Sequence, residues 1–330
     1  ANCGSCHGVH DVLPATDPAS HIHTDNLANT CGQCHPGAGK SFPIGPIHVD
    51  AHDRANPGVY WVRQIYLWLI FVTIGGMIVH NALDLYRTAR GGIPRAPHGE
   101  IPDEGVRMVP GFGVAHMLML VSFGVLVYSG FALKYPDAWW AAPLQYGSEQ
   151  FDLRGWVHRV GAILMLAAVA VHFVHLAVDR DARRCMIRGM IPTLADVREF
   201  RDRMLWYLGL RPDPPHTPKL GYPEKMEYLA LMWGILVMTV TGFLLWFENW
   251  TLAYLPGGAD DIATAIHWYE AILASLAILV WHFYFVLIDP VVYPMDTAWL
   301  TGRGHRNRVA ERLGTAVRDL PGSTRPKVRG

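Results

Sequence analysis

Residues 266–290, IHWYEAILASLAILVWHFYFVLIDP, decide the fold class of this chain. The segment is apolar over enough residues to cross a bilayer as one helix. It also carries His267 and His282, fifteen residues apart. On an α-helix this separation gives about 22 Å of rise and about 60° of rotation, so both rings leave roughly the same face. Since histidine is costly inside a membrane span, the pair predicts a helix that holds two haems, one above the other; the alternative is two hydrogen-bonding core histidines.

The composition agrees with a membrane protein. Of the 330 residues, 51% are hydrophobic and only 17% are charged, which excludes a disordered chain and a purely soluble fold. The 28 Lys and Arg balance the 28 Asp and Glu. Four of the five cysteines fall into two CxxCH motifs and Cys185 stands alone, so the cysteines do not form a disulfide framework.

Two CxxCH motifs, at 3–7 and 31–35, are the most specific signal in the chain. Two thiols at this spacing form thioethers to one haem, and the next histidine becomes the proximal iron ligand. A zinc site or a thiol redox pair is the alternative. The predicted covalent attachment points are Cys3, Cys6, Cys31 and Cys34, and the predicted proximal ligands of the two c-type haems are His7 and His35.

The rest of residues 1–58 is rich in Pro, Gly, Asp and Asn and has no periodic apolar face. A segment this small and polar cannot build an ordinary core, so we expect the haems to form it. No leader precedes the first motif, which suggests that a leader was removed or that the chain is part of a longer one.

Long apolar runs predict five transmembrane helices, at roughly 59–86, 112–134, 156–178, 226–248 and 264–288. The predicted fold class is therefore all-α: an integral membrane bundle of five helices with a small haem-packed N-terminal segment. Segments 87–111, 179–225 and 289–330 hold 4, 10 and 8 Lys or Arg, whereas 1–58, 135–155 and 249–263 hold 2, 1 and 0. This excess places the first set, with Cys185 and the C-terminus, in the cytoplasm and the N-terminus outside, where c-type haem is attached.

With this topology the histidines pair by depth. His158 and His267 fall near the outer face, and His116 and His282 near the inner face. Each pair would clamp one b-type haem between helices. His172, fourteen residues after His158, is an alternative to His116 in the inner pair.

Spans 2 to 5 resemble the di-haem cytochrome b subunits of formate dehydrogenase, nickel–iron hydrogenase and thiosulfate reductase. The matching stretches are VAHMLMLVSFGVLVYSGF, RGWVHRVGAIL, LVMTVTGFLLW and IHWYEAILASLAILVWHF. The resemblance covers roughly residues 110–290 and implies that the haem b ligands are His116, His158, His267 and His282. The last two are fifteen residues apart here, where fourteen is usual in that family.

The N-terminal run CHGVHDVLPATDPASHIHTDNLANTCGQCHPG resembles repeats of multihaem c-type cytochromes. That resemblance makes His10, His23 and His48 candidate distal ligands for the two c-type haems. The predicted domains are then a periplasmic di-haem c-type segment at 1–58, the first transmembrane helix with its loop at 59–111, a four-helix di-haem b domain at 112–290 and a basic tail at 291–330.

Further polar residues lie in the predicted spans. His80, Asp84 and His175 fall near the inner end, and Glu270 lies one turn after His267. They are either an interfacial hydrogen-bonding cluster or groups that exchange protons with a bound quinone.

We therefore expect two haem c and two haem b groups in the inner membrane of a bacterium. They would carry electrons between menaquinone or ubiquinone and a periplasmic cytochrome or redox enzyme subunit. Quinol oxidation is the favoured direction, and reverse flow fits the same residues. The alternative is a non-catalytic electron wire and membrane anchor of a larger periplasmic complex; a redox sensor or a transporter is the weaker third. No phosphate loop or nucleic-acid motif is present.

Overall fold

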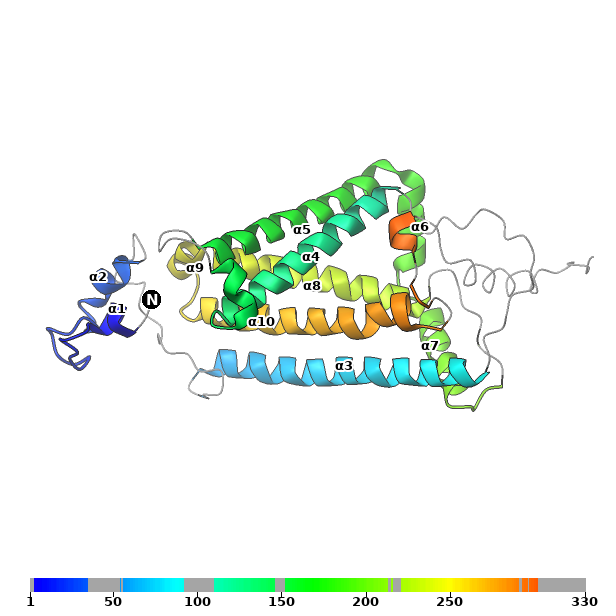
Figure 1. The fold of residues 1–330 in the computed structure, drawn as a ribbon, viewed down its shortest axis with the longest axis horizontal. Coiled ribbons are helices and arrows are strands. Elements are labelled where there is room, and N and C mark those ends of the chain that lie inside the picture. The colour runs from blue at the N-terminus through cyan, green and yellow to red at the C-terminus, as the bar shows by residue number, and fades with distance from the viewer. Residues whose placement is uncertain are drawn as a thin grey trace, which may run out of the picture. The chain divides into compact units, whose positions relative to one another are not determined.

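A computed structural model describes residues 3–34, 54, 56–91, 110–145, 152–212, 215, 221–290, 293–295 and 297–301. This part of the chain is 79% helical and contains no strand (Figure 1). The chain divides into two compact units. The first comprises Ala1–Gly75 with Leu231–Ala274, and the second comprises Gly76–Ala230 with Ser275–Gly330.

Five helices are long and apolar enough to cross a membrane, as the sequence predicts. The first four are α3 (Pro57–Gly91), α4 (Pro110–Lys134), α5 (Leu153–Val178) and α8 (Tyr222–Trp246), and the fifth begins as α10 (Ala259–Ala277) and continues through η2 (Ile278–His282) and η3 (Tyr284–Ile288). Each begins two to five residues earlier than the apolar pattern alone indicates. The protein is thus an all-α, multi-pass membrane bundle.

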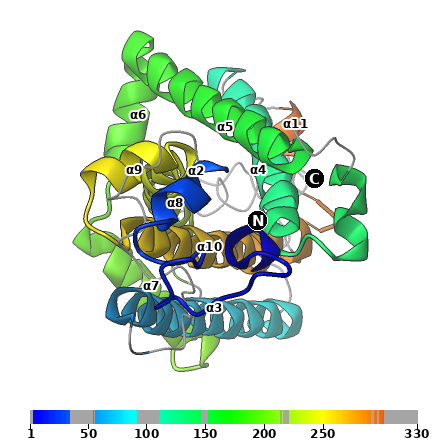
Figure 2. The ribbon, with the colours of Figure 1, turned by 90° about the vertical axis from the view of Figure 1, so that its left-hand side faces the viewer.

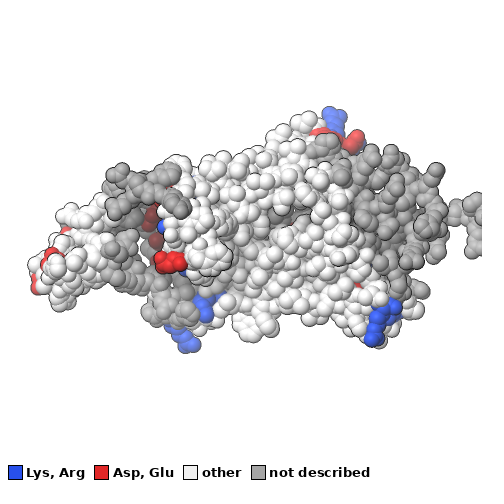
Figure 3. All heavy atoms as spheres, in the orientation of Figure 1, with Lys and Arg blue, Asp and Glu red and all other residues white. Residues whose placement is uncertain are grey.

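The long helices expose large apolar side chains. On α3, Trp68 and Phe71 are 67% and 70% exposed, as lipid-facing residues are. On the face that Figure 3 shows, the described surface over these helices is almost uncharged. Trp68 lies well inside α3, away from both of its ends.

In the second unit α4 and α5 pack closely side by side, and both ribbon views show them adjacent (Figures 1 and 2). A Cβ on Gly161 of α5 would come within 3.1 Å of Val125 of α4, so the small residue permits this approach. Ser122 and Ser129 of α4 are completely buried. Small residues of this kind are the usual packing surface between membrane helices.

Short helices flank the spans: α1 (Cys3–His7), α2 (Leu27–Gly32), η1 (Trp139–Leu144), α6 (Arg180–Met190), α7 (Leu194–Tyr207), α9 (Glu248–Tyr254) and α11 (Ala298–Thr301). A capping box of Thr193 and Asp196 starts α7. The side chain of Asp196 also forms a buried ion pair with Lys225 of α8 at 2.6 Å. This pair fastens α7 to α8 within the second unit.

Candidate functional site: histidines of the membrane helices

His116 of α4 and His282 of η2 lie next to one another in the second unit. Their ring centroids are 6.4 Å apart and the ring planes are inclined by 42°. A metal–nitrogen bond is about 2 Å and a ring nitrogen lies about 1.1 Å from the ring centre, so two imidazoles on opposite sides of one ion have centroids roughly 6.2 Å apart. The observed separation fits the two axial ligands of one haem iron.

The Nδ1 atom of His282 contacts the Glu227 carboxylate of α8. A carboxylate only accepts hydrogen bonds, so we assign the ring proton to Nδ1. Nε2 then carries a lone pair, which is the form of histidine that binds iron. The Nδ1 atom of His116 is buried without a hydrogen-bond partner among the described residues.

His158 of α5 is supported by a hydroxyl in the same unit. Ser129 of α4 lies 2.9 Å from His158 Nδ1 and donates its own proton to the Val125 carbonyl at 2.6 Å. Its oxygen can then accept a hydrogen bond from the ring, and on this basis we assign the ring proton to Nδ1. A Cβ on Gly130 would come within 3.2 Å of His158 Cε1, so glycine makes room for the ring.

The first unit repeats this arrangement around His267 of α10. Thr241 of α8 donates to the Val237 carbonyl at 2.7 Å, and its hydroxyl oxygen lies 2.9 Å from His267 Nδ1. A Cβ on Gly242 would come within 3.3 Å of His267 Cε1. Ser129-Gly130-Phe131 and Thr241-Gly242-Phe243 are thus the same hydroxyl–glycine–aromatic motif, on two different helices.

Sequence reasoning missed these supports, although a signal was present. The motif occurs in two of the stretches that carry the family resemblance, and Glu227 is an ionisable residue at the start of an apolar run. His158 belongs to the second unit and His267 to the first, so their pairing as ligands of one haem stays a prediction.

All four predicted haem b ligands are partly exposed, whereas His80 is buried, with 6% exposure. His172, the alternative ligand, lies instead 3.0 Å from the Tyr228 hydroxyl through Nε2. The structure thus brings His116, and not His172, next to His282.

A π-helical turn, η2, ends at His282. In η2 the Phe283 amide donates to the Ile278 carbonyl, five residues earlier. Such a turn takes up one residue more than an α turn. The separation of fifteen positions from His267 to His282 is therefore equivalent in register to a separation of fourteen positions on a regular α-helix. Asn81 of α3 donates to the Val280 carbonyl at 2.6 Å and so contacts this turn directly.

Two of the predicted quinone-site residues, Asp84 and His80, have buried polar partners within the second unit. Asp84 of α3 accepts from Tyr207 at 2.6 Å and from Tyr284 at 2.5 Å. His80, one turn earlier, contacts Asn81 at 3.2 Å and the Tyr222 hydroxyl at 2.5 Å. Burial and then the Asp84 charge raise the pKa of Tyr207 well above its ordinary range, which keeps it a neutral donor.

The other two candidates have other neighbours within their own units. His175 packs edge-on against Phe112 of α4, with ring centroids 4.8 Å apart, and a Cβ on Gly111 would meet its ring. Its Nε2 is buried without a partner among the described residues. Glu270, in the first unit, is 4% exposed and accepts from the Tyr66 hydroxyl at 2.9 Å.

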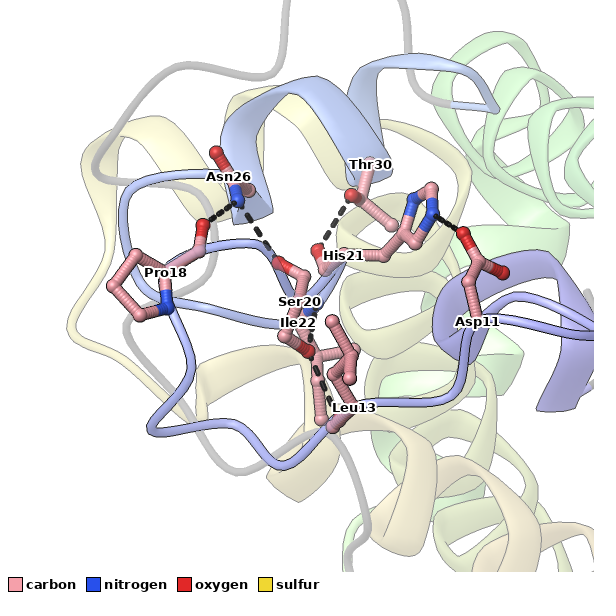
Figure 4. A network of polar contacts seen from close by, with 8 residues as sticks. All are labelled: Asp11, Leu13, Pro18, Ser20, His21, Ile22, Asn26 and Thr30. Carbon is pink, nitrogen blue, oxygen red and sulfur yellow. Dashed lines mark hydrogen bonds and ion pairs between the residues drawn. The ribbon is translucent and has the colours of Figure 1, made fainter.

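The N-terminal segment is held by polar contacts (Figure 4). Ser20 and Thr30 are its buried residues among 4–34, while Val9 and Val12 are 74% and 61% exposed. Ser20 donates to the Leu13 carbonyl at 3.1 Å and Thr30 to the His21 carbonyl at 2.7 Å. Among residues 4–34 no apolar side chain is buried.

The first CxxCH motif forms α1, which puts Cys3 and Cys6 one turn apart, and Gly8 with a φ of +77° follows its last residue. Cys31 lies in α2, with Cys34 just after it. Burial raises the pKa of the Cys31 thiol, and the charges of Cys6 and Cys34 raise it further, so the two motifs lie close together. Cys6, Cys31 and Cys34 form no disulfide.

Two of the candidate distal ligands are described. His10 is exposed. His23 Nδ1 lies 3.3 Å from the Asp25 amide, which donates to it. His21, which was not among the candidates, binds Asp11 at 2.7 Å; this contact, followed by a backbone hydrogen bond, lowers the pKa of Asp11. His35 and His48 lie outside the described residues.

Within the described residues, no three His, Cys, Asp or Glu side chains converge on a metal position. A six-coordinate haem iron takes only two protein ligands, so its site in the protein is a pair of histidines and not a group of three ligands. No protein-family model, curated protein or solved structure matches this chain.

Proposed function

We propose that this chain is a membrane b- and c-type cytochrome that transfers electrons between the quinone pool and a periplasmic redox partner. The observation that carries the proposal is the geometry of His116 and His282, whose centroid separation of 6.4 Å fits two axial ligands. The polar contacts at Nδ1 of His158, His267 and His282 support it. These three polar contacts would be an unusual coincidence for histidines that only fill an apolar core.

Haem supplies a one-electron carrier, and the protein supplies ligation, spacing and local polarity. His116 with His282, and His158 with His267, would each hold one b-type haem. Cys3, Cys6, Cys31 and Cys34 would attach two c-type haems, with His7 and His35 as their proximal ligands. The exposed Val9 and Val12 are apolar surface that a haem would cover.

The location follows from the same proposal. Attachment of haem to CxxCH takes place outside the cytoplasm, and the basic segments fall on the opposite side of the five spans. We infer a bacterial inner-membrane protein with a periplasmic N-terminus and a cytoplasmic C-terminus. Its family would be that of the di-haem cytochrome b subunits that spans 2 to 5 resemble.

In the favoured direction a quinol bound near the His116–His282 pair is oxidised to the quinone. It loses two electrons and two protons, the electrons reduce two equivalents of a periplasmic one-electron acceptor, and the protons leave through titratable groups nearby. His80, Asp84 and His175 are the candidates for that role. Glu270 is the candidate for a quinone site near the other pair.

One observation favours the second candidate function, an electron wire and membrane anchor without a quinone site. His80 and Asp84 have their polar atoms taken up by Asn81 and three tyrosines of the chain itself. Side chains whose polar atoms already form hydrogen bonds within the protein have fewer atoms left to bind a ligand.

Adding a menaquinol analogue to the purified, oxidised chain separates the two functions. The proposal expects b-type absorption bands to become reduced first and c-type bands to follow, and Asp84→Asn to slow this reaction without affecting reduction by dithionite. If dithionite reduces both kinds of haem and quinol reduces neither, the chain has no quinone site and the wire-and-anchor function replaces the first.

A further inference from the structure

Two buried residues of α3 contact the segment around His282, and all of these residues belong to the second unit. The side-chain amide of Asn81 donates to the Val280 carbonyl at 2.6 Å. The Asp84 carboxylate accepts from the Tyr284 hydroxyl at 2.5 Å. Val280 lies two residues before His282 and Tyr284 lies two residues after it, so α3 contacts this segment on both sides of the predicted ligand.

The first of these contacts falls in the π turn. A π turn pairs an amide with the carbonyl five residues earlier, and where a helix returns to pairing four residues apart, one carbonyl is passed over. Carbonyls away from water need a donor from elsewhere when no backbone amide reaches them. Asn81 is 7% exposed and supplies such a side-chain donor to Val280, within η2. A donor at this position favours the π turn over a regular α-helical turn.

His80 determines which way the Asn81 amide points. The Nδ1 atom of His80 lies 3.2 Å from Asn81 Oδ1, and its Nε2 atom lies 2.5 Å from the Tyr222 hydroxyl. We assign the ring proton to Nδ1, where it is donated to Asn81, and the Tyr222 proton to the hydrogen bond with Nε2. The Asn81 amide nitrogen is then left to donate to Val280. The His80 ring also packs on Trp281, with ring centroids 4.8 Å apart.

We propose that α3 positions the predicted haem ligand His282, with Asn81 as the residue that holds the π turn and Asp84 as a second attachment through Tyr284. This inference rests on the proposed function and deepens it. Glu227 of α8 contacts the His282 ring at Nδ1, whereas α3 holds the backbone that carries the ring. The resemblance to di-haem cytochrome b subunits covers roughly residues 110–290, so it assigns α3 no such role.

The test uses two measurements on the purified full-length chain: the rate at which haem b is lost to excess apomyoglobin, and the low-spin ferric signal in electron paramagnetic resonance. His116→Ala removes the signal of the His116–His282 haem and so identifies it. Asn81→Leu keeps the approximate size of the side chain and removes the donor. We expect this haem to be lost roughly tenfold faster and its signal to shift, because the His282 ring changes its orientation.

A second background separates the π turn from general packing of α3. Deleting Leu279 should convert η2 into regular α-helix, in which backbone amides four residues on pair with the carbonyls. In the chain without Leu279, Asn81→Leu should therefore no longer accelerate haem loss. A simple loss of packing would have the same effect in both backgrounds.

Two tyrosines that share one acceptor provide a matched control. Tyr284→Phe and Tyr207→Phe each remove one hydrogen bond to Asp84. Only Tyr284 belongs to the segment around His282, so only Tyr284→Phe should shift the signal of this haem.

The proposal is overturned if Asn81→Leu leaves haem loss and the signal as in the wild type, or if its effect is equal in the chain without Leu279. If Asn81→Leu does not fold, or if the deletion itself abolishes haem binding, the tyrosine pair decides, and equal signals in Tyr284→Phe and Tyr207→Phe overturn the proposal. A wild-type chain that binds no b-type haem would instead overturn the proposed function.

Discussion

At the scale of single residues, a hydroxyl followed by a glycine on one helix contacts a histidine of another helix. Ser129 and Gly130 contact His158 in this way, and Thr241 and Gly242 contact His267. The hydroxyl donates its one proton to a carbonyl of its own helix, and we assign its oxygen as the acceptor of the Nδ1 proton of the ring. The glycine lets the ring approach the backbone. Together they fix the tautomer and the orientation of His158 and His267, which is how outer-shell partners usually prepare a metal ligand.

Thr241→Val tests this feature, because it removes the acceptor while keeping the shape of the side chain. The buried Nδ1–H of His267 then has no partner there, which costs about 1–3 kcal/mol. We expect roughly a 10-fold or greater loss in affinity for one b-type haem. Thr241→Ser is the matched control, because it keeps the hydroxyl. Equal haem binding by the two variants would show that this contact has no role.

At the scale of elements, the π turn of η2 compensates for the extra residue between His267 and His282. Deleting Leu279, which is 56% exposed, should convert the turn into regular α-helix and leave the register of His282 unchanged. Inserting one alanine at the same place should rotate the helix after it by about 100°. The spectrum of the His116–His282 haem should survive the deletion and disappear with the insertion; the reverse result would contradict the assigned register.

The ion pair between α7 and α8 gives a second prediction at this scale. Burial raises the pKa of Asp196, but Lys225 and the hydrogen bonds from Thr193 lower it more, so the net shift is downward. A carboxylate with a lowered pKa stabilises the folded state fully above its unfolded pKa of about 3.9, and this contribution is lost as the pH falls through the folded pKa. Melting of the detergent-solubilised wild type should therefore shift to lower temperature only below about pH 4.

Lys225→Met should cost about 3–5 kcal/mol at neutral pH, because it leaves Asp196 buried and unpaired. The double variant Asp196→Asn with Lys225→Met should recover part of this loss, since no charge is then buried. Unfolding measured by calorimetry or tryptophan fluorescence would rank the wild type, the single variant and the double variant by stability. A single variant as stable as the wild type would mean that the pair does not hold α7 in place.

At the scale of the whole molecule, the apolar runs are enough to predict five membrane-spanning helices, because length and composition alone decide which segments can cross a bilayer. The starts of the helices were less predictable, since capping residues such as Thr193 and local hydrogen bonds set them. The short helices α6 and α9 were missed because neither carries an apolar run.

The histidines of the candidate site could be found from sequence, because an ionisable residue in a span is rare. Their partners could not be assigned in the same way. Glu227, Ser129 and Thr241 contact histidines 55, 29 and 26 residues away, so the contacts depend on how each helix is rotated against its neighbour. The same applies to His172, which only the structure places beside Tyr228.

The orientation of the chain in the membrane is a prediction at this largest scale. Asp137, in the turn after α4, and Asp181 of α6 are both exposed. In a Cys185→Ser background, Asp137→Cys should react with a membrane-impermeant maleimide in intact cells, and Asp181→Cys only after permeabilisation. The opposite pattern would reverse the predicted topology and with it the direction of electron transfer.

The most direct test of the central claim is a count of haems on the purified full-length chain. Extraction with acidified acetone removes haem b and leaves haem c attached, so pyridine spectra before and after it give both numbers. The account predicts two extractable and two covalent haems per chain. A chain with no extractable haem would contradict it, because the four histidines of the membrane helices would then have a purely structural role.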